Sequence, residues 1–390
     1  MRKSLIVVAV LLFSMPLLAG TKTTVQQLDD LLADLHKQSK SDDAVAAKLK
    51  DVELTEQLTS SKMNSFSQYQ PGPSTVEQIH ILAVESALMP PPAGDLPTAA
   101  PPDMATQKAI VGRAVEYVSK QVTHLPRFTA EKVTARFQNG LDYVPVGSLT
   151  GSSMGNADLG FGPSHQYLRL LGQHTSTIVS ESGIELPPAK PKRGDPGGQN
   201  GQISQGGPGP VLSVILLDAA KGSITWGRWE TVDGKQVAVF AFAVNRKQSH
   251  YQVNYCCFPQ IENVGSHIGA SPSASQGTTG PTGDNYGTNT SFAPFKTTAG
   301  YHGEFFIDPD TGTIVRLITQ ADLKPSDYVR QEDIRIDYSP VEIGGKSYVL
   351  PVKSMILTQV IPTGDSAVKF SIRRTLFDET YQNYQVAAAQ

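Results

Sequence analysis

Charged residues are scarce in this sequence: they make up 18% of its 390 residues, and the formal net charge is −3. This composition argues against a chain that its own charge keeps disordered. No block of basic residues occurs, so we expect no nucleic-acid partner. Beyond residue 20 no apolar run is long enough for a membrane helix, so we expect no integral membrane protein. Glycine and proline follow no G-X-Y period, which excludes a collagen-like chain.

Signatures of common catalytic and cofactor sites are missing as well. The chain contains no H-E-x-x-H, no G-x-x-x-x-G-K-[ST] and no G-x-G-x-x-G that opens a helix. The 8 histidines show no ligand spacing; they are His36, His80, His124, His165, His174, His250, His267 and His302. The sequence therefore predicts no metal site and no cofactor, and it favours a protein that is not an enzyme.

A hydrolase stays open as an alternative because of two patterns. GSSMG fits G-x-S-x-G around Ser153, although a nucleophile elbow needs a following helix and this segment is a polar loop. Two acid pairs, Glu230 with Asp233 and Asp333 with Asp337, would suit glycoside hydrolysis if the fold brought each pair together. Acids near strand ends are usually solvated, so solvent exposure is the simpler interpretation.

The two cysteines, Cys256 and Cys257, are neighbours in the segment SHYQVNYCCFP. Three interpretations are open: reduced and mostly buried thiols, a disulfide between the neighbours, and a metal or redox role. A disulfide here would strain the peptide, because successive strand side chains point to opposite faces. No histidine cluster stands near the pair in the sequence, which argues against a metal.

Residues 1–19 have the pattern of an export signal. Arg2 and Lys3 precede the short apolar core Leu5–Phe13, and Ala19 is the small residue before an expected cleavage site. The core is too short to span a bilayer comfortably. We therefore expect a mature chain outside the cytoplasm, either periplasmic or secreted.

Residues 20–88 are predicted to form a helical region, followed by a proline-dense linker at 89–104. Apolar residues at spacings of three and four mark the first helix; they are Val25, Leu28, Leu32 and Leu35. A second helix is expected after Ser41, with Asp42 in its first turn. Ser74 opens an S-x-x-E pattern, which predicts a capping box at the start of a third helix.

Residues 105–390 are predicted to form a helix and then a curved antiparallel sheet, or half-barrel. The apolar runs alternate with turns and not with long helices, which favours antiparallel pairing. Asp233-Gly234 predicts a tight hairpin, and the run 210–220 is predicted to be a helix. Two segments rich in Gly, Pro, Ser and Thr, 185–210 and 259–298, are predicted to be largely mobile loops. The expected fold class is α+β.

The stretch GEFFIDPDTGTIVRL, 303–317, raises the question whether Asp308 and Asp310 bind a metal ion. An EF-hand calcium loop needs oxygen ligands at alternate positions and a glutamate at the twelfth, where Thr319 stands. Gly312 suits the positive φ that a hairpin often needs. The loop therefore predicts a turn that carries no metal.

The segments HLPRFTAEKVTARF, GSITWGRWETVDGKQVAVFAFAV and YHGEFFIDPDTGTIVRL resemble parts of exported acidobacterial proteins of uncharacterised function. TTVQQLDDLLADLHKQSKSDDAVAAKLKDVELTEQL resembles the start of the same group. This resemblance implies export and carries no known active site. A strand series with IDPDTGTIVRL in one hairpin is also similar to the half-barrels of lipoprotein carriers and periplasmic sigma-factor regulators, which does not by itself imply a function.

Aromatic residues stand on the predicted strands; they are Trp226, Phe240, Phe242, Tyr251 and Tyr255. Core packing is the simplest role for them. A concave sheet that they line would also bind a lipid, an acyl chain or another apolar ligand. We therefore expect a non-enzymatic envelope protein that binds such a ligand. The alternative is a protein-interaction module, in which the N-terminal helices dock onto an envelope partner.

Overall fold

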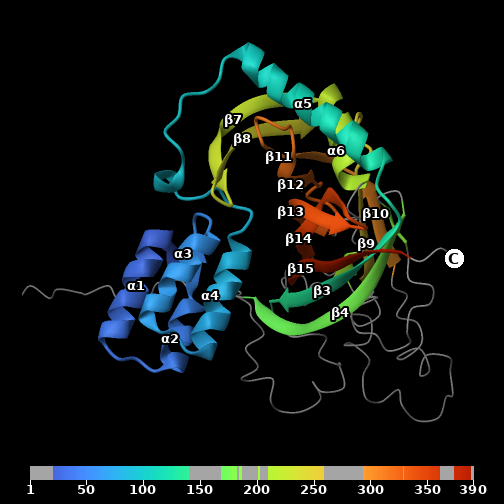
Figure 1. Ribbon diagram of the computed structural model, residues 1–390. Coiled ribbons are helices and arrows are strands. Elements are labelled where there is room, and N and C mark those ends of the chain that lie inside the picture. Colours follow the sequence, from blue (N-terminus) through green and yellow to red (C-terminus); the bar gives the residue numbers. More distant parts are fainter. Residues whose placement is uncertain are drawn as a thin grey trace, which may run out of the picture.

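The computed structural model describes residues 21–139, 168–181, 184–186, 201–202, 210–258, 293–327, 329–360 and 373–387. The chain forms an N-terminal helical unit and a ten-stranded antiparallel sheet that carries two further helices (Figure 1). The predicted α+β fold is thereby confirmed. The predicted export signal lies outside the described residues.

The helical unit is built from short elements that share one core. They are β1 (Thr21–Thr23), α1 (Val25–Lys37), α2 (Asp42–Leu49), β2 (Val52–Leu54), α3 (Ser60–Ser65), the 3-10 helix η1 (Phe66–Tyr69) and α4 (Pro73–Glu85). Thr24 caps α1 in a capping box with Gln27. The predicted stripe of α1, including Leu28 and Leu32, is buried against Ile79 of α4 and other apolar residues of the unit. The apolar stripe of α1 therefore forms part of the core of the unit.

The start of α4 differs from the prediction. The helix begins at Pro73 with Gly72 as its N-cap residue, so the predicted capping box at Ser74 is wrong. The carboxylate of Asp42, from α2, accepts hydrogen bonds from the backbone N–H groups of Ser74 (2.8 Å) and Thr75 (2.9 Å). A residue distant in sequence thus supplies the acceptor that the first turn of α4 needs.

The main sheet follows helix α5 (Met104–Thr123), which a linker with the 3-10 helix η2 (Ala93–Asp95) joins to the helical unit. Its strands are β3 (Phe128–Gln138), β4 (Arg169–Glu181), β5 (Ile184–Glu185), β7 (Ser223–Val232), β8 (Lys235–Val244), β11 (Gly300–Ile307), β12 (Ile314–Asp322), β13 (Val329–Ile343), β14 (Lys346–Val360) and β15 (Arg373–Val386). The strand order is β5-β4-β3-β15-β14-β13-β12-β11-β8-β7, with antiparallel neighbours throughout. In the described part of the chain, β5 and β7 do not pair with each other, so the sheet stays open.

Helix α6 (Pro210–Lys221) precedes β7, where the sequence predicts a helix. The hairpin predicted at Asp233-Gly234 joins β7 to β8; both residues have positive φ, 50° and 77°. A second, three-stranded sheet has the order β10-β9-β6 and consists of β6 (Gly201–Gln202), β9 (Gln252–Phe258) and β10 (Ala293–Thr298). Strands β6 and β10 fall within the two segments predicted as loops, and most other residues of those segments lie outside the described ranges.

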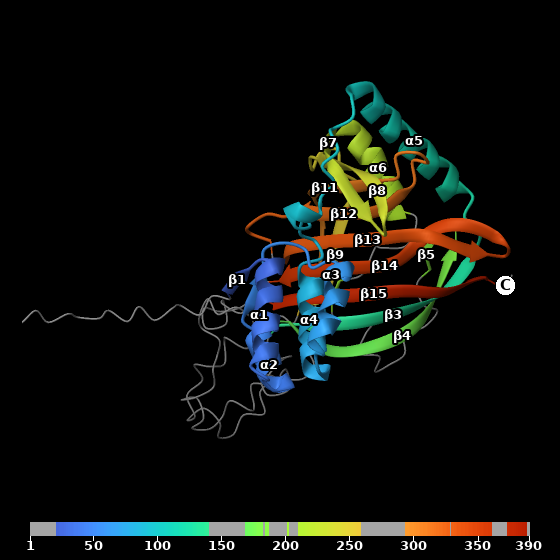
Figure 2. The same ribbon diagram turned by 60° about the vertical axis from the view of Figure 1, so that its left-hand side comes forward.

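The two faces of the main sheet carry different helices. Phe305, Leu317 and Ile336 are cross-strand neighbours and point to the face that α5 and α6 cover. On the opposite face, Met355 packs with Ile81 and other residues at the end of α4. We call these faces the α5–α6 face and the α4 face. Figures 1 and 2 show the N-terminal helices on one side of the sheet and α5 and α6 on the other.

Candidate functional site

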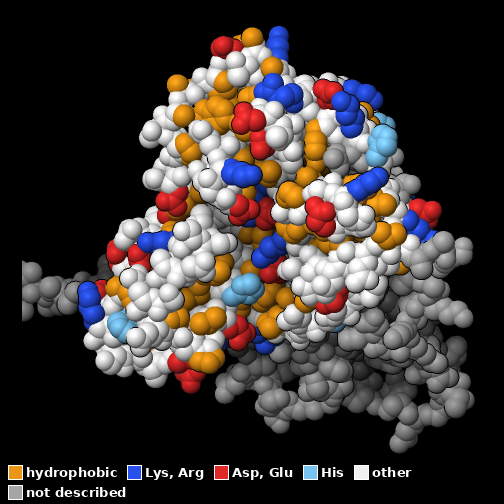
Figure 3. All heavy atoms as spheres, in the orientation of Figure 1, with side chains coloured by type: hydrophobic (Ala, Val, Ile, Leu, Met, Phe, Trp, Pro, Cys, Tyr) orange, Lys and Arg blue, Asp and Glu red, His pale blue; other side chains and the backbone are white. Residues whose placement is uncertain are grey.

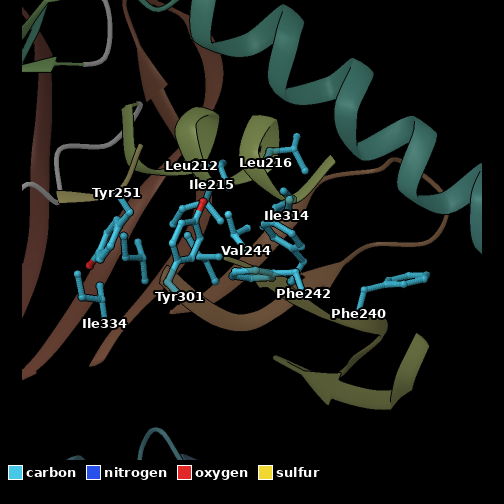
Figure 4. Packing of buried hydrophobic residues seen from close by; sticks show 14 of the residues in the cluster. Leu212, Ile215, Leu216, Phe240, Phe242, Val244, Tyr251, Tyr301, Ile314 and Ile334 are labelled. Atoms are coloured by element: carbon cyan, nitrogen blue, oxygen red, sulfur yellow. The ribbon is translucent and has the colours of Figure 1, made fainter. Parts of the chain in front are cut away.

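The α5–α6 face carries a large apolar cluster, rich in aromatic rings (Figure 4). The ring of Phe242 lies 4.5 Å from that of Phe305 and 5.9 Å from that of Tyr301, centroid to centroid. Of the aromatic residues singled out in the sequence, Phe240, Phe242, Tyr251 and Tyr255 are buried here, and Trp226 packs against the cluster. The predicted strands thus bring their aromatic side chains together on one surface.

Helices α5 and α6 cover this surface with aliphatic side chains. The contributing residues are Ile110, Ala114 and Val118 from α5, and Leu212, Ile215, Leu216 and Ala219 from α6. Figure 4 shows the α6 residues lying over Tyr301 and Phe242. A polar contact ties α5 to the β11–β12 turn, because Arg113 Nη2 donates a hydrogen bond to the carbonyl of Pro309 (2.6 Å).

The loop between β11 and β12 is a turn, as predicted. One carboxylate oxygen of Asp308 accepts hydrogen bonds from the backbone N–H groups of Asp310 (2.9 Å) and Thr311 (3.0 Å). Gly312 has a φ of 76°, and a Cβ on it would lie 2.5 Å from the carbonyl carbon of Arg113. The loop therefore needs glycine for its conformation and for its close approach to α5.

A buried carboxylate anchors α6. Asp218 accepts hydrogen bonds from His250 Nδ1 (2.6 Å), from the backbone N–H of His250 (2.7 Å) and from the hydroxyl of Tyr301 (3.1 Å). Burial and this carboxylate raise the pKa of Tyr301, so its hydroxyl keeps the proton that it donates. One side chain thus joins α6, the β8–β9 connection and β11.

Asp218 and Tyr301 were not among the site residues predicted from the sequence. An available signal was the single acid within the apolar run PVLSVILLDAA, because a carboxylate in a buried helix face requires partners. The residues that supply those partners, Tyr301 and His250, stand far along the chain, and the sequence alone does not identify them.

Glu332 is a second buried acid on the α5–α6 face. Burial raises its pKa to about 8. A hydrogen bond from the Tyr251 hydroxyl (3.2 Å) favours the charged form and so opposes this rise, but burial has the larger effect. The carboxyl group therefore holds its proton at neutral pH in the folded protein. On the α4 side, burial also raises the pKa of Glu85, to about 7.

Stability should fall as pH rises from weakly acidic to weakly basic values. An unfolded glutamate releases its proton near pH 4.5, whereas folded Glu332 releases it near pH 8, so the folded state binds more protons between these values. We expect the free energy of unfolding, measured in urea, to be larger at about pH 5 than at about pH 8.5 by a few kcal/mol. Glu332→Gln should remove much of that difference, and Glu85 should account for part of the remainder. A wild-type protein that gains stability between these two pH values would contradict this assignment.

The α4 face carries a network of alternating charges. Arg316 and Arg335 both donate to the carboxylate of Asp337, with nitrogen–oxygen distances of 2.5 and 3.0 Å. Arg335 Nη1 also donates to the carbonyl of Ala87, just beyond α4 (2.8 Å). The arginines hold the pKa of Asp337 below its usual value although burial opposes this. Figure 3 shows acidic and basic side chains together where the N-terminal helices meet the sheet.

The structure does not bring the two predicted acid pairs together as catalytic carboxylates. Glu230 is buried beside Arg228 (2.7 Å) and Arg316 (3.6 Å), whereas Asp233 occupies the β7–β8 turn. Asp337 is neutralised by arginines, and Asp333 stands earlier in the same strand, β13. These acids therefore give no support to a glycosidase.

Two other predictions concern residues that the structure does not describe fully. Ser153 and the GSSMG segment lie outside the described residues. The backbone of Cys256 and Cys257 belongs to β9, but their side chains are not described, so the interpretation of the pair as thiols or a disulfide stays open.

Within the described ranges, no cluster of His, Cys, Asp and Glu is suited to hold a metal ion. Likewise, no helix in the part that the structure describes combines the length and the apolar character needed to cross a bilayer. Comparison with protein-family models, with curated proteins and with solved structures found no match for this chain. The predicted resemblance to exported acidobacterial proteins and to half-barrel carriers therefore stays a prediction.

Proposed function

We propose that this chain is an exported, non-enzymatic envelope protein that binds a lipid or another apolar ligand between the sheet and helices α5 and α6. The supporting observation is the covering of the aromatic α5–α6 face by two helices from separate segments of the chain. A ligand site needs a large apolar surface with a few polar groups at defined positions. Asp218 and Arg113 are such groups, because each ties one of the two helices in place.

An acyl chain can replace the contacts that α5 makes. Burying a side chain such as Ile110 or Val118 contributes roughly 1.5–3 kcal/mol, and a buried CH₂ group of a ligand contributes about 0.8 kcal/mol. A chain of about ten carbons therefore offers an apolar contribution similar to that of the side chains through which α5 contacts the sheet. Entry of the ligand then requires α5 to move away from the β11–β12 turn, where Arg113 holds it.

The test is uptake of a fluorescent acyl probe by the purified protein. Arg113→Ala removes the hydrogen bond to Pro309, and we expect it to increase the rate of probe uptake several-fold, because α5 separates from the sheet more often. Lys108→Ala is the matched control on the exposed side of the same helix and should leave the rate unchanged. Circular dichroism should show the same helix content in both variants. If the wild-type protein takes up neither the probe nor lipids from an extract, the proposed function is wrong.

A further inference from the structure

The apolar cluster continues across the sheet to a polar margin on β3 and β4. Ile356 belongs to the cluster, and its cross-strand neighbour Phe377 packs against it. Arg136 is the cross-strand neighbour of Phe377, and Gly172 is the neighbour of Arg136. One row across four strands thus runs from the aromatic surface to an arginine and then to a glycine.

Arg136 is a cation without a carboxylate partner. Its Nη2 donates to Oε1 of Gln138 (2.9 Å). Its Nε is buried and has no hydrogen-bond partner, and no carboxylate of the described residues forms an ion pair with it. Lys132, on the same strand and face, differs because Glu185 (3.3 Å) and Glu379 (3.7 Å) neutralise it. A buried N–H donor of a charged group is costly to leave unpaired, so Arg136 has capacity for an acceptor.

There is space on β4 at the position opposite Arg136. A Cβ added to Gly172 would meet no atom within 4 Å, so the position opposite Arg136 is open. The β3–β4 register also shifts between Arg136 and Phe137, where the regular pairing is interrupted. A small acidic group can therefore approach Arg136 from the β4 side while a tail extends past Phe377 toward the cluster.

We infer that Arg136 binds the anionic head of an amphipathic ligand, a carboxylate or a phosphate attached to an acyl chain. This inference rests on the proposed function and adds the class of head group. A guanidinium group pairs with carboxylate or phosphate through two parallel hydrogen bonds, and the unpartnered Nε supplies one of the donors. The tail would occupy the surface of Phe377, Ile356 and their neighbours under α5 and α6.

The experiment compares ligands that share a twelve-carbon tail and differ in the head: dodecanoate, dodecyl phosphate, dodecanol and dodecylamine. Displacement of a neutral apolar dye from the purified protein gives the affinity of each. We expect the two anions to bind about 10- to 100-fold more tightly than dodecanol. Dodecylamine should bind most weakly. Tighter binding of dodecanoate than of dodecyl phosphate would indicate a fatty acid as the ligand, and the reverse order would indicate a phosphorylated lipid.

Two variants of the same position separate binding from folding. Arg136→Gln should remove the preference for anions and leave dodecanol affinity within about twofold, because only the charged contact is lost. Arg136→Lys should keep part of the preference for anions, since lysine retains the positive charge but lacks the two parallel N–H donors of the guanidinium group. Arg246→Gln, an exposed arginine on the β8–β9 connection, is the control for net charge and should change nothing. The urea midpoint of Arg136→Gln should stay close to that of the wild type, because the change removes one hydrogen bond, to Gln138, and no ion pair.

Three results would overturn the inference. Equal affinity of the wild-type protein for dodecanol and dodecanoate would show that no head-group site exists. An equal loss of both ligands in Arg136→Gln would mean that the arginine only supports the fold. In either of these cases, binding of the neutral dye would leave the proposed function intact. The third result is that neither the dye nor any amphiphile binds, which would reject both the inference and the proposed function.

Discussion

Replacing Asp337 with asparagine is expected to lower the free energy of unfolding by about 3–5 kcal/mol. The change removes one negative charge. It leaves the buried Arg335 without a carboxylate partner and the partly buried Arg316 with Glu230 alone, at 3.6 Å. Removing one member of a buried ion network lowers the free energy of unfolding by far more than the whole network contributes to it. The reason is that the remaining charges stay buried, away from water, without their partner. The loss should extend to the docking of α4, since Arg335 also holds the carbonyl of Ala87. Urea unfolding followed by circular dichroism measures the change.

The control for this prediction is Asp310→Asn, which removes an exposed carboxylate in the β11–β12 turn. It should change stability by less than about 0.5 kcal/mol. If Asp337→Asn lowers the free energy of unfolding by less than about 1 kcal/mol, Asp337 behaves like a member of an exposed ion pair, which contributes little to stability. The buried network on the α4 face would then not hold the sheet and α4 together.

Removing the carboxylate of Asp218 is the second change with a large expected effect. Asp218→Ala leaves the hydroxyl of Tyr301 and two donors of His250 without an acceptor. Hydrogen bonds to a charged group contribute about 1.5–3 kcal/mol each and are not additive within a network, so we expect a total loss of about 3–5 kcal/mol. Urea unfolding measures the loss, and hydrogen exchange of α6 amides should show that this helix opens first.

The matched control for α6 is the neighbouring Leu217→Ala. Leu217 is 65% exposed, so its truncation should cost less than about 0.5 kcal/mol. If Asp218→Ala lowers the free energy of unfolding by no more than this control does, the carboxylate is not the anchor of α6. The acyl-probe assay adds a functional measurement, because a loosened α6 should speed probe uptake as Arg113→Ala does.

Features with local causes could be predicted from the sequence. The turn at Asp308 depends on an acceptor and a glycine within a few residues, and the structure has both in the expected roles. The helix α5 and the hairpin at Asp233-Gly234 also follow from local periodicity and turn chemistry. The cap of α4 could not be predicted, because its acceptor is Asp42, more than thirty residues earlier.

The candidate site depends on pairings between distant segments. The acids Glu230 and Asp337 were candidates for catalysis in the sequence, yet the strand order places Arg316 between them. Asp218 and Arg136 were not candidates, because a sequence does not tell which charged residue will find a partner. The register of β15, β3 and β4 places Arg136 beside a glycine, which cannot supply a charged partner.

By itself, the sequence determined the types of element, their approximate places and the antiparallel character of the sheet. These follow from apolar periodicity, turn residues and the lack of long helices between strands, all of which act over a few residues. Tertiary structure alone decided which face each helix covers, which acids are neutralised and that Arg136 has no carboxylate partner. Those outcomes depend on burial and on charges from separate strands, and both exist only once the chain has folded.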